Sequence, residues 1–269
     1  MAKIGFLGAG NMAEAIIKGV IDAKIYKSKD IIITDIRIQQ AETIRNKYKV
    51  IVFHSNPQLA KSVDILVLSV KPQGMPFALR QIKDSVRKNL LIVSIAAGVT
   101  TKKIQKVLGN VAVVRVMPNT PALIGQGAAA IYATKNAKAK VGAVKQIFSA
   151  VGLAVEVSDE KLLDAVTAVS GSGPAYFFLL MEEMIKTAQK LGLKKDLAER
   201  IVLQTAKGAG LLAAEAIKAG QTPDILRKIV TSPGGTTEAA MKVFLKRKFE
   251  KTVLEALRAA ANRSRQLSR

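Results

Sequence analysis

The chain contains no cysteine and no tryptophan, and it has a single histidine, His54, among its 269 residues. Without cysteine there are no disulfides, thiolate nucleophiles or thiolate metal ligands, which is typical of a cytosolic protein. One imidazole excludes a histidine-based metal cluster, so we expect no metal site. An acid–base mechanism that uses histidine would depend on His54 alone, and its polar surroundings, VFHSNPQ, favour a surface role.

Long apolar runs and aromatic residues are also scarce. No apolar run is long enough to cross a bilayer, and a predicted strand begins at once, so we expect a cytoplasmic protein without a membrane partner or signal peptide. Aromatic residues make up 4 % of the chain, and its lysines are scattered although the net charge is +22. Proteins dedicated to nucleic acids usually concentrate basic residues and add aromatic side chains for stacking. We therefore expect a basic shell around a phosphate-binding site and no dedicated nucleic-acid partner.

Short β-branched runs alternate with amphipathic stretches over the first part of the chain. The expected strands are Lys3–Leu7, Ile31–Thr34, Ile65–Leu68, Leu91–Ile95, Val111–Val116, Ala129–Tyr132 and Ala154–Val157. The expected helices between them are Met12–Ala23, Ile38–Tyr48, Met75–Asp84, Thr101–Leu108 and Lys138–Val151. This alternation predicts an α/β fold with a Rossmann-type, doubly wound and mostly parallel sheet.

The strand pattern disappears beyond residue 157, and only helical patterns remain. The longest expected helices are Tyr176–Leu191, Leu197–Ala219 and Phe249–Leu267. Apolar residues of the middle helix, such as Ile201, Val202 and Leu203, lie on more than one face, so this helix needs cover on two sides. We therefore predict a dinucleotide-binding domain at 1–157 and an all-helical domain at 158–269 that a second chain covers.

The stretch KIGFLGAGNM joins the first expected strand to the first helix. Gly8, Gly10 and Ala13 fit the pattern G-x-G-x-x-G/A, in which the first glycine makes the turn and the second lets backbone approach a pyrophosphate. The phosphate then lies at the helix N-terminus, where free N–H groups and the helix dipole favour an anion. Because the motif opens a βαβ unit, we predict dinucleotide binding in preference to an ordinary tight turn.

The residues after the second strand leave the choice between NADPH and NADH open. Asp35 can accept hydrogen bonds from ribose hydroxyls, which favours NAD, whereas Arg37 can pair with a 2′-phosphate, which favours NADP. Three further loops follow expected strands, namely SVKPQ, SIAAGVT and MPNTPALIGQG. Because open parallel sheets bind ligands beyond the carboxyl ends of their strands, we expect these loops to join the site.

Two glycine-rich segments, SGSGPAY and SPGGTT, precede helices in the second half of the chain. Glycines at a helix start expose consecutive N–H groups, which makes each segment a candidate cradle for a carboxylate or an oxyanion. Thr236 and Thr237 can also be simple N-caps of the helix that follows.

Taken together, GFLGAGNM, VKP, SIAAGVT, MPNTPALIGQG, SGSGPAY and SPGGTT closely resemble the motifs of the pyrroline-5-carboxylate reductase family. The resemblance runs from about Lys3 to Leu267 with the same order and spacing. It implies reduction of Δ1-pyrroline-5-carboxylate to L-proline, the last step of proline biosynthesis, by NADPH or NADH. It also implies a helical domain that binds the substrate and interlocks with a second subunit in a homodimer, and family dimers often assemble into homodecamers.

The resemblance also implies roles for individual residues. The cofactor-binding residues would be Gly8, Ala9, Gly10, Asn11, Met12, Asp35, Arg37, Asn56, Ser69, Val70, Lys71, Pro72, Ala96, Ala97 and Gly98. The substrate carboxylate would be held around Ser232, Gly234, Gly235 and Thr236. Thr237 would hydrogen-bond the ring nitrogen and donate or organise the proton. NADP-preferring relatives often end the second strand in small polar residues, and this chain departs from that pattern with its aspartate.

The implied reaction needs few catalytic side chains, because a protonated cyclic imine accepts hydride readily and the enzyme mainly aligns the reactants. The alternatives are a β-hydroxyacid-dehydrogenase-like enzyme, an imine reductase with another substrate, and a non-catalytic dinucleotide-binding regulator. The first of these places a catalytic lysine on the long helix after a glycine-rich turn. Here the first cation of that helix is Lys186, three turns in.

Overall fold

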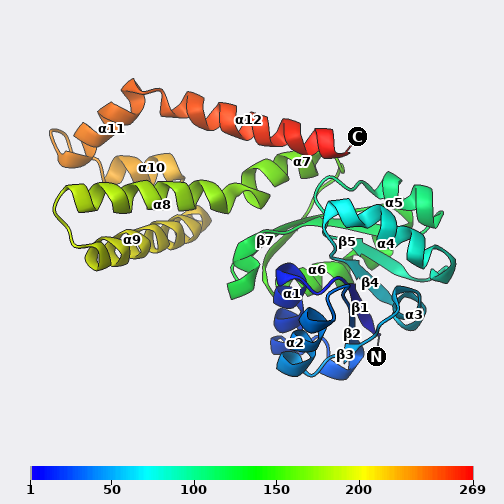
Figure 1. Cartoon of the computed structure of the whole chain (residues 1–269). Coiled ribbons are helices and arrows are strands. Elements are labelled where there is room, and N and C mark those ends of the chain that lie inside the picture. The colour runs from blue at the N-terminus through cyan, green and yellow to red at the C-terminus, as the bar shows by residue number, and fades with distance from the viewer. Residues whose placement is uncertain (1, 269) are drawn as a thin grey trace. The chain divides into compact units, whose positions relative to one another are not determined.

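The computed structural model describes residues 2–268 of the chain. Contacts within the chain divide it into two compact units, residues 1–174 with 259–269 and residues 175–258. The first unit contains the sheet and the second is helical (Figure 1). The domain boundary expected after residue 157 stays a prediction, and the compact units differ from it by grouping 158–174 and 259–269 with the sheet.

In the described part of the chain, eight strands form one sheet in the order β3-β2-β1-β4-β5-β6-β7-β8. Their bounds are β1 Ile4–Leu7, β2 Ile31–Thr34, β3 Ile51–Val52, β4 Ile65–Leu68, β5 Leu91–Ser94, β6 Ala112–Met117, β7 Gly127–Ala133 and β8 Gly152–Glu156. Neighbouring strands run parallel except for β6 and β7, which pair antiparallel. The prediction of a doubly wound, mostly parallel sheet is confirmed. The strand order reverses at β1, which is where such sheets bind ligands.

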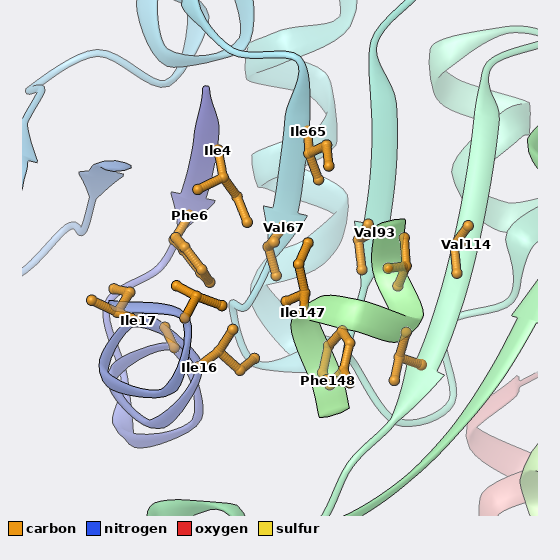
Figure 2. Packing of buried hydrophobic residues seen from close by; sticks show 14 of the residues in the cluster. Ile4, Phe6, Ile16, Ile17, Ile65, Val67, Val93, Val114, Ile147 and Phe148 are labelled. Atoms are coloured by element: carbon orange, nitrogen blue, oxygen red, sulfur yellow. The ribbon is translucent and has the colours of Figure 1, made fainter. Parts of the chain in front are cut away.

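Helices cover both faces of the sheet in the first unit. They are α1 Asn11–Asp22, α2 Ile38–Tyr48, α3 Asn56–Ser62, α4 Met75–Ile82, α5 Thr101–Leu108, α6 Val141–Ser149 and α7 Leu162–Val166. Alternate residues of a strand point to opposite faces, so β1 sends Phe6 into one buried cluster and Leu7 into another. Figure 2 shows the first cluster, in which Phe6 lies with Ile16 of α1 and Phe148 of α6. Because both faces are filled, the strand ends are where a ligand can bind.

The second unit contains α9 Lys195–Ala216, α10 Pro223–Ile229 and α11 Thr236–Lys246, together with most of α8 Gly173–Lys190 and the first half of α12 Phe249–Ser268. Many of its large apolar side chains are exposed, among them Phe177, Phe178, Leu179, Leu211, Leu212 and Val243. As expected for α9, Val202 is buried while Ile201 and Leu203 are about half exposed. No helix within residues 2–268 has the length and hydropathy needed to cross a membrane.

The polar stretch VFHSNPQ contains two elements that we did not predict, the end of the β3 region and the start of α3. The β3 strand has only two residues, which is too short for an alternating pattern. The start of α3 carries recognisable signals, because Ser55 accepts a hydrogen bond from the Gln58 N–H at 3.3 Å and a proline follows in the first turn. His54, the residue just before this cap, is exposed.

Candidate functional site

The turn after β1 requires glycine at its first position. Gly8 has φ +104°, and a Cβ there would lie 3.0 Å from backbone atoms of Ser69 and Val70. Its N–H donates to the Thr34 carbonyl oxygen at 2.8 Å, and Ser69 Oγ donates to the Gly8 carbonyl oxygen at 2.6 Å. The turn is therefore hydrogen-bonded to the end of β2 on one side and to the loop after β4 on the other.

Gly10 leaves the N-terminus of α1 open. A Cβ on Gly10 would meet nothing within 4 Å, and no side chain caps the helix that begins after it. The first N–H groups of a helix have no intrahelical acceptor, and the helix dipole favours an anion beside them. Asn11 is exposed at this position, while the side chain of Met12 packs against the core. The open helix end fits the pyrophosphate of a dinucleotide.

Asp35, directly after β2, is turned toward the glycine-rich turn. Its Oδ2 accepts the Ala9 N–H at 2.8 Å, and its Oδ1 accepts the Arg37 N–H at 2.8 Å. Arg37 Nε lies 3.3 Å from the same Oδ1. Burial acts to raise the pKa of Asp35, but the hydrogen bonds from Ala9 and Arg37 outweigh it and hold the pKa below its usual value. The carboxylate is therefore charged and bound to three protein donors.

The loops after β4 and β5 carry most of the other expected cofactor residues to the same end of the sheet. Ser69–Pro72 follow β4, which pairs with β1, and Ala96–Gly98 follow β5, which pairs with β4. Lys71 is exposed and has no acidic partner among the residues that the structure describes. Asn56 begins α3, and its Nδ2 donates to Gln81 Oε1 at 2.7 Å. The carboxyl ends of neighbouring parallel strands thus gather these residues along one edge.

The segment SPGGTT forms the turn before α11, in the second compact unit. Gly234 has φ +73°, and Gly235 is the N-cap of α11, so the alternative in which Thr236 or Thr237 is a simple N-cap does not hold. The Gly235 N–H donates to the Ser232 carbonyl oxygen at 3.0 Å. Both threonines instead lie in the first helical turn, because glycine fits the entry geometry without a side chain.

This turn already binds a carboxylate of the protein itself. The Gly234 N–H donates to Glu238 Oε2 at 3.1 Å, and Lys242 Nζ donates to the same oxygen at 3.0 Å. The N–H groups of Thr236 and Thr237 occupy the first positions of α11, where helix geometry provides no acceptor. Thr237 is half-buried, and its hydroxyl has no partner within residues 2–268. The turn therefore combines backbone donors that have no intrahelical acceptor with the Thr237 hydroxyl.

Two polar contacts that we did not predict join distant motifs of the first unit. Asn119 Oδ1 accepts the Ala128 N–H at 2.8 Å, and its Nδ2 donates to Ser170 Oγ at 3.1 Å. Ser170 lies in a π-helical turn, Thr167–Gly171, a feature that is frequent at functional sites. The segments MPNTP and SGSGP are therefore connected directly. No local signal could have revealed this pair, because the partners are far apart in the sequence.

The second unexpected contact is a buried ion pair next to α5. Arg115 on β6 is 3 % exposed, and its Nη1 lies 3.1 Å from Glu160 Oε1. Glu160 also accepts the Thr101 N–H at 2.8 Å and the Thr101 hydroxyl at 2.7 Å. Because Thr101 starts α5, this pair ties the loop after β5 to β6 and to the segment that leads into α7.

Two family models match the chain. Residues 160–267 match the model described as pyrroline-5-carboxylate reductase dimerisation, and residues 3–98 match the model described as NADP oxidoreductase, coenzyme F420-dependent. A curated pyrroline-5-carboxylate reductase from Pseudomonas aeruginosa is 44 % identical over 268 residues, which cover 99 % of this chain and 97 % of the relative. The chain belongs to the pyrroline-5-carboxylate reductase family. The family resemblance of the motifs is thereby confirmed.

Solved structures of this family have the same fold over the full length. A pyrroline-5-carboxylate reductase from Coxiella burnetii superposes with a TM-score of 0.91 at 38 % identity, covering 100 % of this chain and 99 % of that one. A Plasmodium falciparum pyrroline carboxylate reductase with NADP bound has a TM-score of 0.88 at 32 % identity, covering 100 % and 98 %. The expected combination of a Rossmann-type sheet and a helical C-terminal region is therefore confirmed.

Proposed function

We propose that this chain is an oxidoreductase that reduces Δ1-pyrroline-5-carboxylate to L-proline with NADPH or NADH, the final step of proline biosynthesis. The observation that carries the proposal is 44 % identity to a curated pyrroline-5-carboxylate reductase across 99 % of the chain. The β-hydroxyacid-dehydrogenase-like alternative is disfavoured, because Lys186 on α8 is exposed and ion-paired with Glu182 and Glu183 of the same helix.

The first unit holds the dinucleotide. Gly8–Met12 form the turn and the open start of α1, whose N–H groups bind the pyrophosphate. Ser69–Pro72 line the path past the ribose, with Asn56 nearer the adenosine, and Ala96–Gly98 lie beside the nicotinamide. When bound, the reduced dinucleotide supplies a hydride. The loops fix the orientation of the nicotinamide, and aligning the two reactants is the main catalytic contribution of the protein in this reaction.

The turn before α11 holds the substrate. N–H groups of Gly234, Gly235 and Thr236, with Ser232 beside them, bind the carboxylate of the ring. The Gly234 N–H, which donates to Glu238 Oε2, and the Gly235 N–H, which donates to the Ser232 carbonyl oxygen, exchange these acceptors for the substrate. The Thr237 hydroxyl bonds the ring nitrogen and holds the proton there, which keeps the imine electrophilic. The imine carbon gains the hydride, its π electrons move to nitrogen, and the nitrogen retains the proton to give the secondary amine of L-proline.

We further propose that the chain works as a homodimer. The match to the dimerisation model over residues 160–267 supports this, and so do the exposed apolar side chains of the helical unit. Exposed apolar side chains in such number are typical of a surface that a partner chain covers. Assembly of dimers into a homodecamer and a cytoplasmic location stay predictions, as does the absence of a metal, a membrane partner and a dedicated nucleic-acid partner.

The test follows the absorbance of reduced nicotinamide while the chain is mixed with Δ1-pyrroline-5-carboxylate, and it identifies L-proline by chiral chromatography. We expect turnover with this substrate and none with 3-hydroxy acids or their oxidised forms. Δ1-Pyrroline, which has the imine but no carboxylate, is the matched control and should react far more slowly. Equal turnover of both imines would indicate a general imine reductase, and cofactor binding without turnover would indicate a regulator.

A further inference from the structure

The turn before α11 holds a carboxylate of the chain against a backbone donor that the proposed reaction uses for the substrate. The Gly234 N–H donates to Glu238 Oε2 at 3.1 Å, and Glu238 lies in the first turn of α11. Gly234 is also one of the residues assigned to the substrate carboxylate. Two carboxylates at one N–H repel each other, so the Glu238 side chain and the substrate compete for this donor.

The local sequence brings the two groups together. Ser232, Pro233, Gly234 and Gly235 fit a type II turn, with proline second, a glycine of φ +73° third, and the Gly235 N–H donating to the Ser232 carbonyl oxygen at 3.0 Å. The turn itself does not use the N–H of its third residue, Gly234. Because Gly235 is the N-cap of α11, Glu238 occupies the helix position from which a glutamate reaches back to the helix start.

Lys242 gives the Glu238 carboxylate a second partner that does not belong to the turn. Its Nζ donates to the same Oε2 at 3.0 Å, and the two residues are one helical turn apart on α11. The Glu238 side chain is 36 % exposed and the Lys242 side chain is 71 % exposed. When Glu238 leaves the Gly234 N–H, it therefore keeps Lys242 and gains water, and no charge is left without a partner.

The substrate carboxylate has more donors to gain than Glu238 has. In the proposed site it meets the N–H groups of Gly234, Gly235 and Thr236, whereas Glu238 takes only the first of these. Within residues 2–268, Glu238 Oε1 accepts no hydrogen bond. The substrate can thus displace Glu238, but its apparent affinity is lowered by the fraction of molecules in which Glu238 occupies the turn.

We propose that Glu238 is an internal competitor for the substrate carboxylate and that Lys242 retains it when the substrate binds, so that this pair sets KM for Δ1-pyrroline-5-carboxylate. The inference rests on the proposed function, because it takes the turn before α11 as the substrate site. A contact that served only to cap α11 would have the opposite consequence. Removing a cap loosens the turn and weakens substrate binding, whereas removing a competitor strengthens it.

The test is steady-state kinetics of Glu238→Ala with Δ1-pyrroline-5-carboxylate. KM should fall roughly 3- to 10-fold, the worth of a contact of capping strength, and kcat should not rise, because Glu238 competes only before the substrate is bound. L-Proline carries the same carboxylate and should inhibit this variant at a correspondingly lower concentration. Glu238→Gln keeps a weaker, neutral acceptor and should have an intermediate KM.

Two controls separate occupation of the turn from other effects. Δ1-Pyrroline has no carboxylate, so its KM should change less than about twofold in Glu238→Ala. Asp224→Asn is the matched variant, because Asp224 also lies in the first turn of a helix, α10, with its Oδ2 3.6 Å from Lys228 Nζ. It should leave both KM values unchanged. At about 1 M KCl, where the Debye length is about 3 Å, general repulsion is screened and the gain in Glu238→Ala should persist.

An unchanged or higher KM for Δ1-pyrroline-5-carboxylate in Glu238→Ala would overturn the inference. An equal fall in KM for Δ1-pyrroline, or a gain that disappears at high salt, would overturn it as well. Circular dichroism checks that the variant is folded, and if it is not, Glu238→Gln carries the same test. No turnover by the unaltered chain would refute the proposed function, whereas turnover with a KM that is insensitive to Glu238 would refute this inference alone.

Discussion

Gly98 and Leu267 are packed so closely that a Cβ built on the glycine would lie 2.6 Å from the Leu267 Cβ. Lys103 Nζ donates to the Leu267 carbonyl oxygen at 3.2 Å, and Ser264 Oγ donates to Asp164 Oδ1 at 2.6 Å. The last turns of α12 are therefore fastened to the first compact unit. They contact the loop after β5, which we assign to the nicotinamide.

Gly98→Ala should destabilise the protein by about 2–4 kcal/mol, because it adds a crowded methyl group to a residue with φ +71°. Gly125→Ala is the matched control, since Gly125 has φ +73° and its Cβ would meet nothing within 4 Å. The control should lower the free energy of unfolding by about 1–2 kcal/mol, because only the unfavourable positive φ contributes. Urea unfolding measures both, and an equal loss in the two variants would contradict the importance of the Leu267 contact.

Thr237→Ala should lower kcat by roughly 10- to 100-fold, which corresponds to the loss of one hydrogen bond to a charged group. KM for the cofactor should change less than about twofold, because the hydroxyl is assigned to the imine and not to the dinucleotide. Steady-state kinetics with both substrates varied will separate the two effects. Thr237→Ser keeps the hydroxyl and should restore most of the turnover, whereas unaltered kcat in the alanine variant would remove Thr237 from the mechanism.

Glu160→Gln should lower the free energy of unfolding by about 3 kcal/mol, because it leaves the buried Arg115 guanidinium without its counter-charge. Arg115 Nη2 already has no partner in the described structure. The bond from Nη1 to Glu160 is therefore the one that compensates the buried charge. Glu156→Gln is the control, since the Glu156 side chain is 49 % exposed and its Oε1 lies 3.8 Å from Lys145 Nζ. This variant should lower the free energy of unfolding by less than about 0.5 kcal/mol. Chemical denaturation of both variants distinguishes a buried pair from a surface pair.

Asp35 should make stability depend on pH. Its hydrogen bonds hold the pKa of the folded state below that of the unfolded chain, so its contribution is present at neutral pH and is lost as the pH falls through the folded-state pKa. Asp35→Asn should therefore have a lower Tm than the unaltered chain at pH 7. The difference should shrink below about pH 4, near the ordinary pKa of an aspartate. A Tm difference that is constant from pH 7 to pH 3 would contradict this assignment.

Phe178→Glu should prevent dimer formation, because Phe178 on α8 is 59 % exposed and a buried carboxylate without a partner is strongly unfavourable. Gln189→Glu adds the same charge to an exposed polar position of the same helix and should leave the dimer intact. Size-exclusion chromatography with light scattering measures the mass directly. Dimers of equal stability in both variants would place the interface on another face.

Local pattern was sufficient to place several regular elements. The expected ranges Ile38–Tyr48 and Thr101–Leu108 agree with α2 and α5 at both ends, and the expected strands Ile31–Thr34 and Ile65–Leu68 agree with β2 and β4. The helix α5 is strongly amphipathic, and β2 and β4 are continuous runs of buried, mostly apolar residues, so neighbours in sequence decide their structure. The pattern failed at β3, where two residues join the sheet only because β2 lies beside them.

The sequence by itself determined the Rossmann-type sheet, the glycine-rich turn and the family, because alternating periodicity and short motifs are properties of neighbouring residues. Only the tertiary structure decided the direction in which Asp35 points, the pairing of Arg115 with Glu160, and the contact of Leu267 with Gly98. Each of these joins segments that are separated along the chain. Their partners depend on how strands and helices pack in space, and periodicity records which side of an element is buried without recording what lies against it.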